Sequence, residues 1–382
     1  MLTILAKYSM LLEFINTITE SQVLTEGARI DHPEDLIFTD GAAGAARALQ
    51  ALSEVAQNPQ NLTIKFDGFP ALVFGRNHDG QLVVADKHMF TKKDGSGRVT
   101  SVQAFIQYDV NRGANRGDLY EKIKVLWPVM EQAVPREVGY YWGDLLWVGR
   151  LQPQNGVFHF KPNTVAYSIN ANSPLGRRIA NSVAGIVVHQ FFPDVDQEAV
   201  VLSGTGNLKT DGPLAVLTPT MPDQVTLKTP VAAIRKVNAM IKQAAPEINS
   251  LFDPTALAAI KCKDLGALMQ KYINARVRGV TATFSDWLAT NVSANKLANL
   301  VGENGYLLQN KAGVDAVFAI FDGISRIKNN LVQQLDTQQN TIQSTINGQA
   351  GGEGYVFSTS QGLIKLVDRA SFSAANFAKN DE

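Results

Sequence analysis

The residues of this chain best suited to chemistry lie in one short stretch, residues 63–76. Lys65, Asp67 and Gly68 form the pattern K-x-D-G between two apolar runs that are typical of β-strands. An ammonium gains nothing from partial burial, whereas burial and neighbouring cations make an amine a better nucleophile by lowering its pKa. The pattern therefore favours a nucleophilic lysine. Two alternatives are an edge-strand lysine that blocks aggregation and an Asp-Gly hairpin turn.

Four further stretches with strand-like patterns follow in order, at residues 139–146, 184–192, 352–357 and 362–368. With residues 63–76, they resemble motifs I, III, IIIa, IV and V of the covalent nucleotidyltransferases. That superfamily comprises the ATP-dependent and NAD-dependent polynucleotide ligases and the mRNA capping enzymes. Five motifs in the same order are far more specific than K-x-D-G alone.

The resemblance implies a role for each motif. Lys65 would attack the α-phosphorus of ATP and form a lysine–AMP phosphoramidate, and Lys365 would stabilise charge at that phosphate. Carboxylate oxygens of Asp144 and Glu353 are suited to Mg²⁺. Phe191 or Phe192 would stack on the base. The implied nucleotide-binding residues are Lys65, Asp67, Gly68, Arg76, Lys87, Asp144, Phe191, Glu353 and Lys365, with Lys65 and Lys365 catalytic and Asp144 and Glu353 binding metal.

Each of these side chains also has a structural interpretation. Asp144 is compatible with a solvated carboxylate at a strand end, and Glu353 with a plain strand start after a glycine-rich loop. Lys365 is compatible with a solvent-facing lysine, and the two phenylalanines with the core. Two residues depart from the family pattern: Asp144 replaces the usual glutamate, and Val367 replaces a second lysine.

Composition predicts a globular protein. The chain has 382 residues, 45% hydrophobic and 18% charged, with 35 basic and 35 acidic residues. This balance argues against a general nucleic-acid coat but allows a local basic groove. The single cysteine, Cys262, fits a reducing compartment. No run approaches the roughly 18 apolar residues of a membrane span, and the N-terminus lacks a signal-peptide pattern. We expect a cytoplasmic location, in the host cytoplasm if the protein is phage-encoded.

The pattern of elements predicts an α+β protein. Helices are expected at residues 9–20, 41–57 and 100–134, and strands at 61–66, 70–76 and 81–86, the last two joined by a turn at 77–80. Strands and loops continue to about residue 225. From Thr229-Pro230 to about residue 345 the pattern is helical, with helices at 232–245, 254–277, 283–301 and 314–346.

Two domains are therefore expected. Residues 1–228 and 350–382 would form a nucleotidyltransferase domain of ATP-grasp-like antiparallel sheets with flanking helices, and residues 229–349 an inserted helical domain. Only 14 residues follow Asp368, too few for the oligonucleotide-binding barrel that follows motif V in DNA ligases. This favours the RNA-ligase side of the superfamily. The layout, with His32-Pro33-Glu34-Asp35 before motif I, also resembles phage proteins.

The sequence thus predicts an ATP- and Mg²⁺-dependent ligase that acts on nucleic acid, RNA rather than DNA. It would adenylylate Lys65, transfer AMP to a 5′-phosphate and seal that end to a 3′-hydroxyl. Two alternatives are a capping-type nucleotidyltransferase and a catalytically inactive nucleic-acid-binding or structural phage protein. The basic loop that holds Lys92, Lys93 and Arg98 is open to two interpretations, a polynucleotide contact and a solvated surface.

Overall fold

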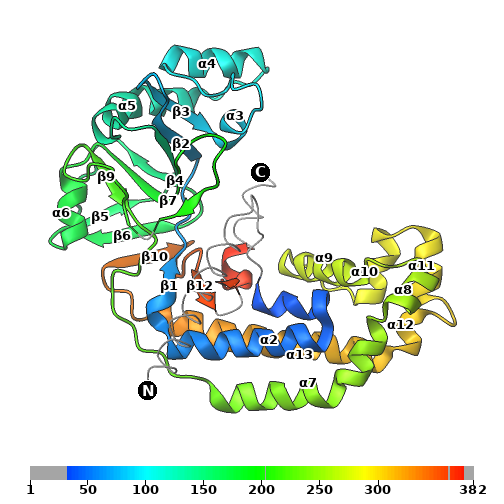
Figure 1. Cartoon of the computed structure of the whole chain (residues 1–382). Coiled ribbons are helices and arrows are strands. Elements are labelled where there is room, and N and C mark those ends of the chain that lie inside the picture. Colours follow the sequence, from blue (N-terminus) through cyan, green and yellow to red (C-terminus); the bar gives the residue numbers. More distant parts are fainter. Residues whose placement is uncertain (1–31, 203, 360–361, 374–382) are drawn as a thin grey trace, which may run out of the picture. The chain divides into compact units, whose positions relative to one another are not determined.

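The structure, a computed structural model, describes residues 32–202, 204–359 and 362–373. It is an α+β protein of helices and mainly antiparallel sheets, and it divides into two compact units (Figure 1). The sheet unit contains the described residues of 63–224 and 339–353, and the helical unit those of 32–62, 225–338 and 354–373. The α+β prediction is confirmed. The helix expected at residues 9–20 lies outside the described residues.

The main sheet of the sheet unit has the strand order β3-β2-β4-β7-β8, and β9 lies beside β7. Neighbours are antiparallel except for the parallel pair β7 and β9. The predicted turn at 77–80 joins β2 to β3, where Asn77 Oδ1 accepts hydrogen bonds from two backbone amides of the turn. The strands are β2 (Ala71–Arg76), β3 (Leu82–Asp86), β4 (Gly139–Val148), β7 (Ala184–Phe192), β8 (Val200–Val201) and β9 (Leu214–Leu217).

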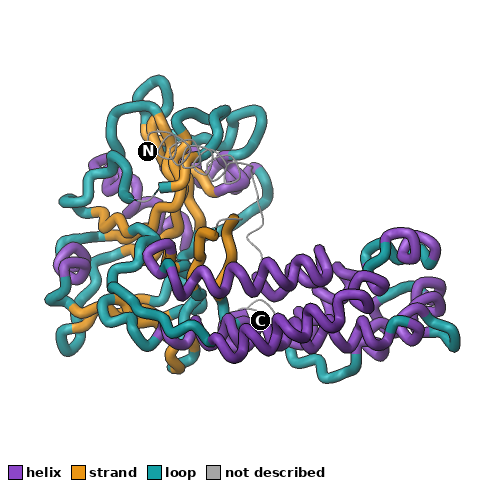
Figure 2. Tube along the Cα trace, turned by 60° about the horizontal axis from the view of Figure 1, so that its bottom comes forward, coloured by secondary structure: helices purple, strands orange, loops and turns teal. Residues whose placement is uncertain are grey.

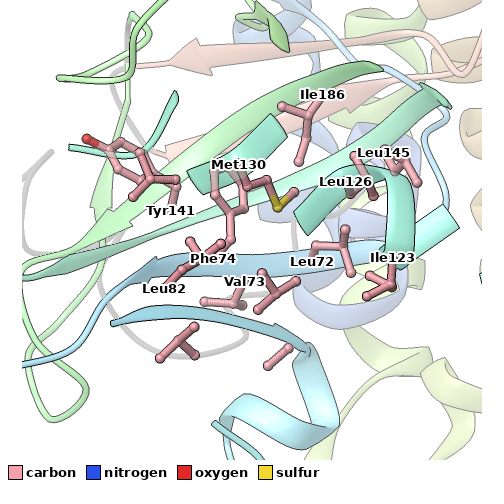
Figure 3. Packing of buried hydrophobic residues seen from close by; sticks show 14 of the residues in the cluster. Leu72, Val73, Phe74, Leu82, Ile123, Leu126, Met130, Tyr141, Leu145 and Ile186 are labelled. Atoms are coloured by element: carbon pink, nitrogen blue, oxygen red, sulfur yellow. The ribbon is translucent and has the colours of Figure 1, made fainter. Parts of the chain in front are cut away.

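The core of the unit packs against this sheet (Figure 3). Side chains of β2 and β4, such as Phe74 and Leu145, meet Ile123, Leu126 and Met130 of α5, and all five are buried. Burying each such side chain stabilises the fold by roughly 1.5–3 kcal/mol. The helices of this unit are α3 (Lys87–Phe90), α4 (Val102–Asn111), α5 (Gly117–Ala133) and α6 (Pro174–Ala180).

The helix predicted over residues 100–134 is two helices. Helix α4 ends at Asn111 and α5 begins at Gly117. Gly113 between them has a φ of 77°, a left-handed conformation that ends a helix and that glycine adopts without strain.

A second sheet of the sheet unit has the order β11-β10-β6-β5. Its strands are β5 (Val157–Phe160), β6 (Ala166–Asn170), β10 (Ile342–Ile346) and β11 (Gln349–Ala350). The prediction of helix through residue 346 is wrong here, because α13 ends at Asp336. Ile342 and Ile346 are buried as β10 pairs with β6, and Asp223 accepts hydrogen bonds from the amides of Asn340 and Thr341. Tertiary pairing therefore overrides the helical pattern of this polar segment.

In the helical unit, α2, α7 and α13 lie side by side (Figures 1 and 2). Val317, Ile320, Ile324 and Leu331 form the buried stripe of α13 at helical spacing. The helices are α2 (Leu36–Gln57), α7 (Val231–Leu251), α8 (Pro254–Ala259), α9 (Leu265–Val277), α10 (Phe284–Asn291), α11 (Ala294–Val301), α12 (Tyr306–Gln309) and α13 (Lys311–Asp336). The helices predicted at 254–277 and 283–301 are each divided in two. None of the helices in the described part of the chain combines the length and apolar character of a membrane span.

A strand hairpin completes the helical unit. Strands β12 (Tyr355–Thr359) and β13 (Gly362–Leu366) pair antiparallel, and the Tyr355 hydroxyl donates a hydrogen bond to Asp336 at the end of α13, 2.7 Å away. The short helical turns of this unit are η1 (Pro33–Asp35), η2 (Pro59–Asn61) and η3 (Arg369–Ser373), and β1 (Leu62–Ile64) spans the boundary between the two units.

The division into units differs from the predicted one, which placed residues 1–228 and 350–382 together. Helix α2 belongs to the helical unit because its apolar face, including Ile37, Leu49 and Leu52, packs within the layer that α7 and α13 complete. Buried charges add to this: Lys328 of α13 pairs with Glu34, and Arg369 pairs with Asp35 at 2.7 Å. The predicted insertion, 229–349, also contains β10 and the first residue of β11, which belong to the sheet unit.

Candidate functional site

Lys65 and Glu353 form an ion pair although 288 positions separate them in the sequence. Lys65 directly follows β1, where the Ile64 amide donates to the Pro219 carbonyl. Glu353 follows β11, so the β10–β11 hairpin carries it to the lysine. The Lys65 side chain is 32% exposed and that of Glu353 is 14% exposed. The amine is therefore accessible to a ligand, whereas the carboxylate is mostly shielded from water.

The environment of Glu353 favours its protonated form. Its pKa rises from 4.5 to about 7, chiefly because the carboxyl is buried. The negative charges of Asp67 and Asp144 raise it further, and the ion pair with Lys65 opposes the rise. Three carboxylates and one ammonium thus share a single electrostatic environment.

Asp67 anchors the loop that follows Lys65. Its Oδ1 accepts a hydrogen bond from Asn163 Nδ2 at 2.8 Å, and its Oδ2 accepts from the amides of Thr164 and Val165 at 2.5 and 2.7 Å. Its own amide donates to the Tyr167 hydroxyl at 2.7 Å. Asp67 is buried, and both of its carboxylate oxygens already accept hydrogen bonds, so it positions the loop. The sequence analysis had instead predicted that Asp67 contacts a nucleotide.

Gly68 brings this loop against β4. A Cβ atom on Gly68 would lie 2.4 Å from the Cβ of Asp144, closer than two carbon atoms that are not bonded to each other can approach. Next to Asp144, the loop continues the sheet: the Phe69 amide donates to the Leu145 carbonyl, and the Leu145 amide donates to the Pro70 carbonyl. The glycine of K-x-D-G is therefore required by the close approach of Asp144, which provides a structural basis for the motif.

His189 is a residue of this site that the sequence analysis did not identify. Its Nε2 lies 3.0 Å from Asp144 Oδ2. Strand β7 has a bulge here, since Trp142 pairs with Gln190 and Gly143 with Val188, which leaves His189 as the extra residue. A bulge redirects a side chain. The only signal in the sequence was a histidine within the apolar run of motif IIIa.

The aromatic side chains of β4 and β7 form two separate contacts. The Phe191 ring packs on Tyr141 at 4.9 Å between ring centroids, and Tyr141 lies in the core. Phe192 instead stacks with Trp142 at 6.3 Å. The placement of Phe191 therefore does not support its predicted contact with a base. On β4, the half-buried ring is that of Trp142, two residues before Asp144.

Lys87 lies close to Trp142. Its Nζ is 5.0 Å from the centroid of the Trp142 ring, a cation–π contact. Lys87 follows Asp86, which aligns with Leu72 on β2, and Leu72 in turn aligns with Gly143 on β4. The structure therefore brings Lys87 to the strand that carries Asp144.

One of the predicted residues of the sheet unit is not brought to Lys65. Arg76 lies at the other end of β2, buried, where its guanidinium donates to Glu131 Oε1 at 2.8 Å and to the Glu131 carbonyl at 3.0 Å. It joins α5 to the sheet and is used structurally. Lys365 belongs to the helical unit, on β13 opposite Val356.

The predicted metal ligands are two carboxylates, Asp144 and Glu353. In the part of the chain that the structure describes, no group of three or more His, Cys, Asp or Glu side chains is arranged to hold a metal ion. Asp144 and Glu353, the predicted ligands, interact through their charges, and each also contacts a basic side chain.

The site thus belongs to an α+β protein whose sheet unit brings a lysine and three carboxylates together. The chain belongs to a family of unknown function, DUF6267, whose model matches residues 28–381. No curated protein and no solved structure gives a significant match to the chain.

Proposed function

We propose that this protein is a covalent lysine nucleotidyltransferase of the polynucleotide-ligase type, with Lys65 as its nucleophile. The observation that carries the proposal is the ion pair of Lys65 with Glu353, which joins the lysine of motif I to the glutamate of motif IV. A solvent-facing lysine with only a structural role has no need of a largely buried carboxylate partner from a distant strand. The antiparallel sheet unit would then be the ATP-grasp-like nucleotidyltransferase domain.

The proposed first step is attack of the Lys65 amine on the α-phosphorus of ATP. A nitrogen–phosphorus bond forms, the bond from the α-phosphorus to the bridging oxygen breaks, and pyrophosphate leaves. The amine must lose its proton, which passes to solvent, and until then the Glu353 carboxylate holds the ammonium by direct contact. Asp67 and Gly68 hold the loop after Lys65 against β4, which orients the amine.

The residues present fit a Mg²⁺ ion in part. The negative charges of Asp67 and Asp144 raise the pKa of Glu353, and a group of carboxylates this close together is suited to a divalent cation. Mg²⁺ commonly binds only one or two protein carboxylates together with phosphates and waters. Asp144 and Glu353 would hold it. When bound, the ion would neutralise phosphate charge.

In the later steps, AMP would pass from Lys65 to a 5′-phosphate, and a 3′-hydroxyl would displace it to seal the two ends. The acceptor is a nucleic acid, RNA rather than DNA. The role of Lys365 at the phosphate stays a prediction from the sequence.

The test is covalent labelling. The full chain is incubated with Mg²⁺ and α-³²P-labelled ATP, GTP or NAD and then resolved by denaturing electrophoresis. We expect ATP to label the wild type and Lys65→Ala to abolish the label, while Lys122→Ala, which changes an exposed lysine of α5, keeps it. Absence of label with all three nucleotides would refute the proposal.

A further inference from the structure

One segment of the sheet unit carries an excess of positive charge. Residues 86–116 contain six lysine and arginine residues and three aspartates, a net charge of +3, whereas the whole chain has a net charge of 0. Within this segment Lys87, His88, Lys92 and Lys93 are all exposed.

These cations alternate with aromatic rings along a continuous series of contacts. Lys87 lies over Trp142, and the next residue, His88, has its Nδ1 3.4 Å from Arg112 Nη1. Arg112 lies 5.6 Å from the centroid of the Tyr108 ring, and Lys92 Nζ lies 5.3 Å from the same centroid. We call this series, Trp142, Lys87, His88, Arg112, Tyr108 and Lys92, the aromatic–basic strip.

Two aspartates, one buried and one half-buried, hold the strip in place. Asp109, which is fully buried, binds Arg112 and Arg116 at 2.7 Å each, and Asp86 binds Arg116 at 2.8 Å. These ion pairs fix α4 and the arginines against β3. Among the interactions described, the lysines contact neither Asp86 nor Asp109, and Lys92 lies 3.3 Å from the exposed Asp94. The arginines are thus the scaffold, and the lysines present charge to solvent.

We propose that the aromatic–basic strip binds single-stranded polynucleotide. Lys87 and Lys92 of the strip, together with the exposed Lys93 beside it in the sequence, would contact phosphates, and a base would stack on the half-buried Tyr108 ring. Proteins that bind single strands combine cations that contact the phosphate backbone with aromatic rings on which the unpaired bases stack. Folded acidic protein surfaces and duplexes do not offer free base faces to an aromatic ring.

The strip begins two residues from Asp144, so a strand bound along it reaches the candidate site. The inference that the bound strand is the acceptor of AMP rests on the proposed function. It assigns polynucleotide binding to the sheet unit, whereas the sequence suggested the helical insertion.

The test measures binding directly, without catalysis. Fluorescein-labelled oligo(U) and oligo(dT) of about 12 nucleotides are titrated with the full chain, followed by anisotropy at low and physiological salt. Tyr108→Leu and Lys92→Gln/Lys93→Gln are each expected to weaken binding about tenfold. The control Lys122→Gln, an exposed lysine of the same unit, should change affinity less than twofold. Circular dichroism establishes that the variants are folded.

Unchanged affinity in both strip variants would overturn the inference, and so would equally tight binding of a blunt duplex, whose bases are stacked. If the strip variants lose binding but Lys65 takes no label from ATP, the strip stands and the proposed function fails. If Lys65 is labelled but the wild type binds neither oligonucleotide, the strip fails and the nucleotidyltransferase stands.

Discussion

The ammonium of Lys65 and the carboxylate of Glu353 are in contact, although 288 positions separate the two residues in the sequence. Between them the chain builds both sheets of the sheet unit and most of the helical unit. The contact places an amine beside a buried acid whose pKa is about 7, which gives the pair a measurable dependence on pH.

The first prediction concerns Glu353→Gln. In the folded protein the pKa of Glu353 is raised from 4.5 to about 7, so the folded state holds this proton more tightly than the unfolded state. The associated stability is fully present below pH 4.5 and is lost as pH rises through 7. We therefore expect the Tm of the wild type to fall relative to that of the variant between these values. Thermal unfolding followed by circular dichroism measures the difference.

The matched control for this pair is Glu121→Gln. Glu121 is 72% exposed on α5, and its side chain contacts only the solvent-facing Lys124 among the interactions described. Its Tm difference from the wild type should not change over the same range. A constant difference for Glu353→Gln as well would show that burial does not perturb the Glu353 carboxyl.

The second prediction concerns the contact of Gly68 with Asp144. Gly68→Ala would place a Cβ 2.4 Å from the Asp144 Cβ, with Asp144 and Leu145 backbone atoms at 3.1 Å, so the loop or β4 must move. We expect a loss of about 1–3 kcal/mol in the free energy of unfolding, measured in urea. Nucleotide labelling of Lys65 should fall as well.

Gly117→Ala is the control, because no atom lies within 4 Å of a Cβ at that position. It should be neutral or slightly stabilising, since alanine is the better helix former. Equal stability of Gly68→Ala and wild type would mean that the loop does not pack on β4 as described.

The third prediction concerns the unit boundaries. Deleting 229–349 removes β10 and half of β11, the hairpin that positions Glu353, and leaves the apolar face of α2 without α7 and α13. We expect that variant to aggregate. In contrast, residues 63–224 joined to 339–353 by a Gly/Ser linker should fold, because Asp223 already binds the Asn340 and Thr341 amides and the joined ends are adjacent.

Solubility, size-exclusion chromatography and a cooperative thermal transition distinguish the two chains. A soluble, folded 229–349 deletion together with an unfolded 63–224/339–353 chain would restore the boundaries predicted from the sequence.

The sequence predicts local structure well where the pattern is strong. The strand-like apolar runs at 70–76 and 81–86, on either side of the turn Asn77–Gly80, form β2 and β3 as expected, and most of the helices from residue 229 onward are present. What it could not predict depends on partners distant in the sequence. Residues 342–346 become a strand because β6 lies beside them, and α2 joins the helical unit because α7 and α13 cover it.

The features of the site that the sequence could not predict also depend on partners distant in the sequence. The residue types at 65, 144 and 353 were identified from motifs, but their surroundings were not. Asp67 proves to be buried under three hydrogen bonds, which the pattern K-x-D-G does not encode. His189 reaches Asp144 only because β7 has a bulge, and bulges depend on strand pairing.

The most direct test of the account is to locate the nucleotide on the chain. The full protein is incubated with ATP and Mg²⁺, digested, and its peptides are mapped by mass spectrometry with and without prior acid treatment. We predict an AMP adduct on the peptide that contains Lys65, removed by acid and absent from a folded Lys65→Ala variant. An adduct on a different lysine, or equal AMP incorporation in Lys65→Ala, would contradict the assignment of Lys65 as the nucleophile.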